Sequence, residues 1–161
     1  MENVILSVIK YILSAYPYKD ELSASRLTKI LYLTDWKNAL EHDAQLSKTV
    51  WHFNHYGPYV DDFVEIARND KDINVVNTKT MFGGNKQLFE LSNKGTTPIY
   101  LEDDLKEIVD FVISATKDKN YDDFIKLVYS TYPVISSSKY SNLDLVSKAR
   151  EYKDQLNARQ C

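Results

Sequence analysis

The chain has 161 residues, 43% of them hydrophobic, which is enough for one globular domain with a single core. Its formal net charge is −3 and its pI about 5.6, so the overall electrostatics do not favour nucleic acid as a partner. Cys161 is the only cysteine, which excludes a disulfide framework, and no apolar run approaches the ~20 residues that span a bilayer. With an acid at Glu2, these features predict a cytoplasmic protein without a membrane partner.

The first part of the chain predicts helices that alternate with an aromatic strand. Apolar residues at helical spacing predict a helix over 3–15, and Ser23 is a candidate N-cap for a second helix that runs to about His42. The aromatic run at 50–53 predicts a short strand. Because Pro58 suits the first turn of a helix, we expect a third helix over about 59–69.

The apolar period then changes to two. Residues 73–77 and 86–91 predict an antiparallel β-hairpin whose connection includes Gly83-Gly84-Asn85, and residues 92–98 predict a loop. A helix follows over 101–112, and another over 121–130, with Asn120 as its cap and Tyr132-Pro133 as its end.

The C-terminal part reads as a linker and a last helix. Ser136 to Ser138 form a linker-like patch, and Ser141 to Asp144 resemble a capping box. A narrow apolar stripe follows at Leu145, Ala149, Tyr152 and Leu156. The expected fold is mainly α, with five to six helices and a small antiparallel β-hairpin in a winged-helix-like order. The expected domains are 1–135, followed by 136–161 as linker plus C-terminal amphipathic helix.

The sequence offers no constellation for catalysis, metal binding or cofactor binding. His52 and His55 are three residues apart, which on a strand directs them to opposite faces. Adjacent acids, such as Asp122-Asp123, lie in the first turns of predicted helices, where they complement the helix dipole. The four glycines do not form a phosphate-binding loop. We therefore expect a protein that is not an enzyme, with no catalytic residues, no metal and no cofactor.

Nucleic-acid binding is the second hypothesis. In a winged-helix order the third helix would enter the major groove. Residues 58–70 hold four acids against Arg68 alone, which opposes contact with a polyanion. The hairpin is more basic, and the candidate nucleic-acid-binding residues of a winged-helix-type regulator are Lys79, Lys86 and Lys94.

Three segments together resemble a known family. Residues 27–36 hold a basic residue, two aliphatic residues and a tyrosine, with an aromatic residue one turn later. Residues 51–60 run from an aromatic strand into Tyr56-Gly57-Pro58, and residues 123–133 form a closing helix that ends at Tyr132-Pro133. This arrangement, over roughly residues 4–133, is similar to the Panacea domain of SocA-like antitoxins in bacteria and phages. Val134 departs from the family pattern, which has tryptophan after the final proline.

The resemblance implies a mostly helical antitoxin, paired in a type II toxin–antitoxin system with a toxin encoded nearby that it neutralises by direct contact. Proteolytic adaptors also occur in the family, so delivery of a client to protease machinery is a further hypothesis. Interfaces favour Tyr and Trp anchors. The candidate partner-binding residues are Asp35, Trp36, His55, Tyr56, Tyr59, Asp62, Tyr152 and Leu156.

Core packing is the alternative role for Trp36 and Tyr56. Because the aromatic junction at 51–60 marks the whole family, we expect it to be the rigid centre of the fold. The contacts that select a partner would then lie around it, on Tyr59, the acidic third helix and the C-terminal tail.

Overall fold

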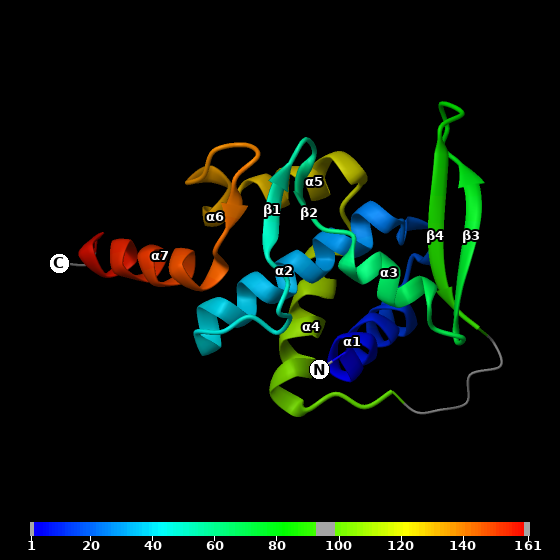
Figure 1. Ribbon diagram of the computed structural model, residues 1–161, viewed down its shortest axis with the longest axis horizontal. Helices are drawn as coiled ribbons and strands as arrows, with labels where there is room; N and C mark the ends of the chain where they lie inside the picture. The colour runs from blue at the N-terminus through cyan, green and yellow to red at the C-terminus, as the bar shows by residue number, and fades with distance from the viewer. Residues whose placement is uncertain (1, 93–98, 160–161) are drawn as a thin grey trace. The chain divides into compact units, whose positions relative to one another are not determined.

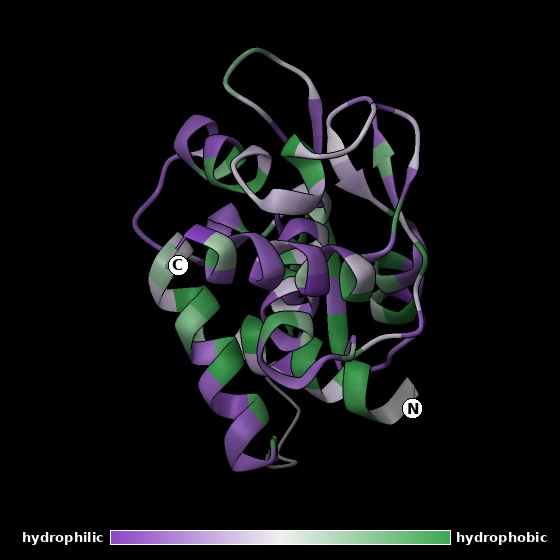
Figure 2. Ribbon diagram, turned by 90° about the vertical axis from the view of Figure 1, so that its left-hand side faces the viewer, coloured by the Kyte–Doolittle hydropathy of each residue, from purple (hydrophilic) through white to green (hydrophobic). Residues whose placement is uncertain are grey.

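The computed structural model describes residues 2–92 and 99–159. This part of the chain holds seven α-helices, one short 3-10 helix and two small antiparallel sheets (Figure 1). The fold is therefore mainly α with small β-hairpins, as predicted, and the helix beyond the six expected is a short one near residue 133. Most helices carry both polar and apolar segments (Figure 2), which is typical of helices that bury one face.

The chain divides into two compact units, residues 1–30 with 61–117 and residues 31–60 with 118–161. Helix α2 (Ala24–His42) begins in the first unit and ends in the second. The boundary expected at residue 135 stays a prediction. No helix among the described residues is both long and apolar enough to cross a bilayer.

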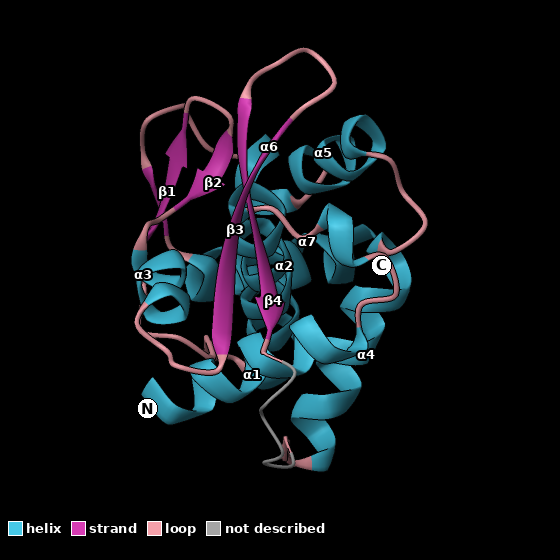
Figure 3. Ribbon diagram, turned by 90° about the vertical axis from the view of Figure 1, so that its right-hand side faces the viewer, coloured by secondary structure: helices cyan, strands magenta, loops and turns pink. Residues whose placement is uncertain are grey.

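The first unit combines helices with a long hairpin (Figure 3). Helix α1 packs against α3, α4 and β4, and its inner face buries Val8, Ile9 and Ile12 completely. Strand β4 also meets the start of α2, since the Phe89 N–H donates to the Leu22 carbonyl at 3.1 Å. The elements of this unit besides the start of α2 are α1 (Glu2–Ala15), η1 (Lys19–Glu21), α3 (Asp62–Arg68), β3 (Ile73–Lys79), β4 (Asn85–Leu91) and α4 (Asp103–Thr116).

The second unit is built around a three-stranded antiparallel sheet of order β2-β1-β5. Asn54 pairs with Gly57, so His55 and Tyr56 form a two-residue turn between β1 and β2. Its core includes Trp51, Phe124 and Val128, all fully buried. The elements of this unit besides the end of α2 are β1 (Trp51–Asn54), β2 (Gly57–Tyr59), α5 (Tyr121–Tyr129), α6 (Tyr132–Ile135), β5 (Asn142–Leu143) and α7 (Leu145–Arg159).

The expectation that Pro58 opens a helix is wrong, because Gly57–Tyr59 is strand β2 and α3 begins at Asp62. Strand β2 lies at the edge of its sheet, where a proline without an N–H is tolerated. Gly57 has a φ of 100°, which few other residues adopt, so the turn before the strand needs glycine.

Two further expectations in the C-terminal part are wrong. Asn142 and Leu143 pair with β1 and do not belong to a capping box; the cap of α7 is Asp144, whose side chain accepts from the Ser147 N–H at 3.1 Å. Helix α5 ends at Tyr129, and Tyr132 and the following proline open α6, a favoured position for proline.

The two helix caps proposed from sequence are confirmed. Ser23 Oγ accepts from the Arg26 N–H at 3.2 Å, and Asn120 Oδ1 accepts from the Asp123 N–H at 2.8 Å. The hairpin over 73–91 is confirmed as well, with Val76 opposite Leu88 at its centre. The expected loop over 92–98 lies outside the described residues, except for Ser92.

Candidate partner-binding surface

Asp35 is 3% exposed and holds the interior of the second unit together. Its carboxylate accepts from the backbone N–H groups of Leu46 and Ser47 at 2.9 and 3.0 Å, from Trp51 Nε1 at 2.9 Å, and from the Ser47 hydroxyl. Burial raises the pKa of this carboxyl, and the four hydrogen bonds oppose the rise. Asp35 therefore fixes the segment that leads into β1 and offers a partner almost no surface.

Trp36 is also interior, at 8% exposure, and meets the ring of Tyr152 edge to face at 6.1 Å. The neighbouring Tyr32 is fully buried, contacts Trp51 edge to face at 5.4 Å and shares a hydrogen bond of 2.8 Å with the Thr131 hydroxyl. These contacts give Trp36 the core-packing role that the sequence left open.

Tyr56 has the opposite environment, because 73% of its side chain is exposed. Trp51 and Phe53, earlier in the same hairpin, are 0% and 7% exposed. The expectation that the whole junction is the rigid centre of the fold is therefore wrong at Tyr56. The start of the hairpin is core, and its turn is surface, since strand side chains alternate and a two-residue turn has no layer above it.

Tyr56 lines a hollow of about 370 Å³, which we call the tyrosine groove. Its other residues come from α5, at positions that share one face of a helix. The neighbouring face of α5 buries Phe124 and Val128 completely, which fixes how the groove residues point. The groove consists of Tyr56, Tyr121, Asp122, Ile125, Lys126 and Tyr129.

The groove walls are held by aromatic contacts from below. Phe53 meets the ring of Tyr129 edge to face at 6.0 Å, and Tyr121 lies tilted against Phe124 at 6.4 Å. Burial, followed by the proximity of Tyr121, raises the pKa of Tyr129, so its hydroxyl stays protonated at neutral pH. The groove therefore presents rings and a neutral hydroxyl, beside the exposed carboxylate of Asp122.

His55 and Tyr140 extend this surface beside the groove. The His55 ring stands edge to face with Tyr56 at 4.5 Å, and its Nδ1 shares a hydrogen bond of 3.1 Å with the Tyr140 hydroxyl. Tyr140 is 59% exposed. Tyr59 is half-buried in β2, and Asp62 is exposed but belongs to the first unit.

The two candidate residues in the C-terminal tail differ in exposure. Tyr152 is half-buried between Trp36 and Tyr132, the latter at 5.3 Å, while Leu156 is 38% exposed. Arg150 forms two hydrogen bonds with the Asp43 carboxylate, at 2.9 and 2.8 Å. The first turns of α7 thus dock on their own unit.

Of the nucleic-acid candidates, Lys79 is exposed near the end of β3. Lys86 Nζ donates to the Asp20 carbonyl at 3.1 Å, and Lys94 lies outside the described residues. Among the residues that the structure describes, no three His, Cys, Asp or Glu side chains gather as a metal site would require.

Sequence reasoning did not single out several exposed aromatic or apolar residues, among them Met81, Phe82, Tyr121 and Tyr140. Tyr121 is 46% exposed, and Met81 and Phe82, at the turn of the second hairpin, are 95% and 96% exposed. An available signal for Met81 and Phe82 was their position directly before Gly83-Gly84, where a turn leaves side chains without neighbours. Tyr121 and Tyr140 carried no such signal, because their exposure depends on tertiary packing.

The fold and the groove define a small, mainly helical protein with an aromatic surface open to solvent. The chain belongs to the antitoxin SocA-like family with a Panacea domain, whose family model matches residues 27–133. Every residue of the tyrosine groove lies within this match, whereas α1 and α7 lie outside it. No curated protein and no solved structure matches the chain.

Proposed function

We propose that this chain is an antitoxin that neutralises a toxin encoded nearby by binding it directly, without catalysis. The family supports the antitoxin role. The observation that carries direct binding is the tyrosine groove, in which Tyr56 and Tyr121 expose large rings within the family match.

The groove has the chemistry of a protein-binding site. Tyrosine combines a large apolar area with a hydroxyl and has few rotatable bonds, so fixing it on binding costs little entropy. Phe53 under Tyr129 and the short turn that carries Tyr56 hold two of the rings before a partner arrives. A preorganised site loses less of its interaction energy to ordering.

Charge at the groove restricts which partner group fits. Asp122 and Lys126 line it from successive turns of α5. Opposite charges at a contact fix the orientation of a partner and reject groups that place like charges opposite each other. We therefore assign affinity to the tyrosines and orientation to this charged pair.

Co-expression with the neighbouring reading frame tests the proposal. The product of that frame should arrest growth alone and become harmless beside the wild-type chain. Combined Tyr56→Ser and Tyr121→Ser should weaken binding at least 30-fold, the loss of a hot spot worth about 2 kcal/mol, while the chain stays folded with a small loss of thermal stability from the Tyr121–Phe124 contact. Ile135→Ser is the matched control, because Ile135 is 67% exposed in the same unit but outside the groove.

Three outcomes contradict the proposal: a harmless neighbour, a neighbour that stays toxic beside the wild-type chain, or full neutralisation by the double variant. The amount of toxin in the same cultures separates sequestration from delivery to a protease. Sequestration leaves the toxin abundant in the complex, whereas an adaptor shortens its half-life.

A further inference from the structure

The turn of the second hairpin exposes two large apolar side chains that no part of the tyrosine groove uses. Met81 and Phe82 are 95% and 96% exposed between β3 and β4. Figures 1 and 3 show this end of the hairpin extending past α1 and α3 of the same unit. Neither side chain contributes to the core, so their apolar area is available for a contact outside this unit.

The turn that carries them is held by its own hydrogen bonds. The Thr80 N–H donates to the Gly84 carbonyl at 2.8 Å, and the Gly83 N–H donates to the Thr80 carbonyl at 3.0 Å. The Gly84 N–H also donates to Thr80 Oγ1 at 3.0 Å. Gly83 has a φ of 82°, so glycine supplies the left-handed residue of this turn. Met81 and Phe82 are thus presented by a defined backbone.

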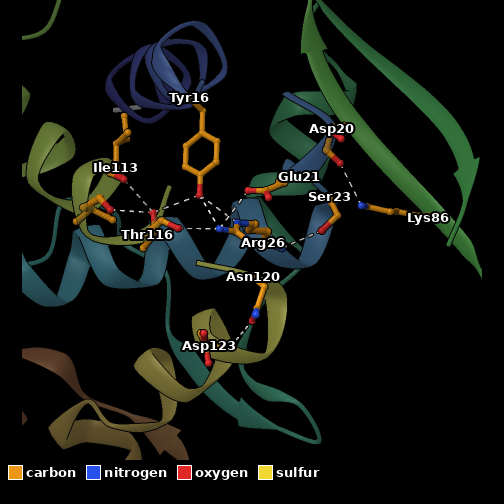
Figure 4. Close-up of polar contacts among 11 residues, drawn as sticks. Tyr16, Asp20, Glu21, Ser23, Arg26, Lys86, Ile113, Thr116, Asn120 and Asp123 are labelled. Atoms are coloured by element: carbon orange, nitrogen blue, oxygen red, sulfur yellow. Dashed lines mark hydrogen bonds and ion pairs between the residues drawn. The ribbon is translucent and has the colours of Figure 1, made fainter. Parts of the chain in front are cut away.

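The hairpin is fixed to the rest of the first unit along β4. Phe89 is 1% exposed, and its N–H donates to the Leu22 carbonyl. Nearer the turn, Lys86 Nζ donates to the Asp20 carbonyl at 3.1 Å (Figure 4). A hairpin anchored along one strand and closed at its turn loses little freedom when a partner covers the tip, which favours tight binding.

The charged side chains that the hairpin carries near its turn are Lys79 and Lys86, which are both basic. Glu90 of the same hairpin pairs with Asn74, near the end away from the turn. A partner surface with acidic residues around an apolar pocket complements this pattern. An anionic lipid surface is a poorer match, because the unit that carries the hairpin holds 14 acids against 11 bases by sequence.

We propose that Met81 and Phe82 form a second anchor for the toxin and insert into an apolar pocket with an acidic rim. This inference rests on the proposed function, since the partner is the toxin of that proposal. The tip supplies buried apolar contact, and Lys79 supplies electrostatic orientation at the rim of the pocket.

The experiment measures binding of the purified product of the neighbouring reading frame to three forms of the full chain. Combined Met81→Ser and Phe82→Ser should weaken binding at least 30-fold with an unchanged melting temperature, because both side chains are almost fully exposed. Tyr100→Ser is the matched control, since Tyr100 is 77% exposed in the same unit and should leave affinity unchanged. Lys79→Glu should slow association at low salt.

The outcomes separate this inference from the proposed function. If the wild-type chain does not bind, the proposed function fails and the second anchor fails with it. If the wild-type chain binds and the tip variant binds equally well, only the second anchor is overturned. Binding of the wild-type chain, but not the tip variant, to phosphatidylserine-containing vesicles would assign the tip to a lipid surface. Dissociation of a wild-type dimer by the tip variant would assign it to a second copy. Either result overturns the inference.

Discussion

The two units use helix α2 in a similar way but with charges of opposite sign. In the first unit α2 buries Arg26 at 2% exposure, and in the second it buries Asp35 at 3% exposure. Each unit also carries a hairpin whose base is core and whose turn faces solvent, at Met81 and Phe82 in one and at Tyr56 in the other. The interior charges lie among polar partners within the two units, whereas both turns expose large side chains, which we propose as contacts for a partner.

Arg26 joins segments that are far apart in sequence (Figure 4). Its guanidinium donates to the Tyr16 hydroxyl at 3.1 and 2.9 Å and to the Thr116 carbonyl at 2.8 Å, and it lies 3.4 Å from the Glu21 carboxylate. The Thr116 hydroxyl donates in turn to the Val112 carbonyl at 2.8 Å. Arg26 thus connects the residue after α1, the segment η1 and the end of α4.

Asp35 organises a more local region. Its four donors come from residues 46–51, and all of them are neutral. Burial raises the pKa of the Asp35 carboxyl, and its neutral donors oppose that rise. The guanidinium of Arg26 stays charged, and its partners are a carbonyl, a hydroxyl and an acid. The comparison shows two ways to satisfy a buried charge: long-range bridging by Arg26 and local capture of a loop by Asp35.

The largest expected effect comes from removing either buried charge. Arg26→Ala and Asp35→Ala should each lower the free energy of unfolding by about 3–5 kcal/mol, because each leaves buried polar partners unsatisfied. Denaturant unfolding measures both values. Asp35→Asn is the control, since it keeps the shape and one acceptor and should cost less than Asp35→Ala. A loss below about 1 kcal/mol for Asp35→Ala would contradict the claim that the hydrogen bonds of Asp35 stabilise the second unit.

Lys29, a third buried charged residue of α2, should make the stability of the protein depend on pH. Lys29 is 1% exposed, and desolvation lowers its pKa from 10.5 to about 8. Between these values the unfolded chain binds a proton that the folded chain has released, so stability rises with pH across that window. Relative to pH values below about 8, the free energy of unfolding should be about 3 kcal/mol higher near pH 10.5 because of Lys29, and this gain should disappear as the pH falls through about 8.

Lys29→Met separates this effect from the other titrating groups. The difference in unfolding free energy between the variant and the wild type should shift by that amount between pH 7 and pH 10.5, in favour of the wild type. A difference that stays constant over this range would show that Lys29 titrates normally.

The two turns should differ in how they tolerate a side chain at glycine. Gly57→Ala and Gly83→Ala both force alanine into the left-handed region, at a cost of about 1 kcal/mol each. Gly57 is buried, so its substitution should cost about 2 kcal/mol in total once crowding is added. A Cβ at Gly83 meets nothing within 4 Å, so no crowding is added there. Thermal unfolding of the two variants measures which substitution lowers stability more. A larger loss of stability for Gly83→Ala would contradict the placement of Gly57 in the core and Gly83 at the surface.

The smallest expected effect is the loss of stability when the N-cap residue of α5 or α4 is replaced. Asn120 caps α5, whereas Glu102, at the equivalent position of α4, makes no side-chain capping hydrogen bond. Asn120→Ala should cost about 1 kcal/mol and Glu102→Ala much less. Because α5 carries five of the six groove residues, loss of its cap should also weaken partner binding slightly. Equal stability losses for the two variants would show that the observed cap adds nothing.

Local chemistry made a large part of the fold predictable. The apolar spacing of α1 and α2 and the caps at Ser23 and Asn120 depend on residues a few positions apart. The second hairpin was also predictable, since alternating residues enclose Gly83 and Gly84. The strand at Pro58 was not, because proline fits a helix start and an edge strand equally well, and the pairing with β1 decides between them.

The sequence by itself therefore determined the class of the protein, its principal helices and its family, because periodicity, capping and motif order are properties of neighbouring residues. Only the tertiary structure decided that Asp35 and Trp36 are interior, that Tyr56 is exposed, and that Tyr56 shares a groove with Tyr121. Tyr56 and Tyr121 are 65 positions apart by their numbers. Whether a ring is core or contact surface depends on what packs above it, and that is set by the pairing of β1 and β2 and by the orientation of α5.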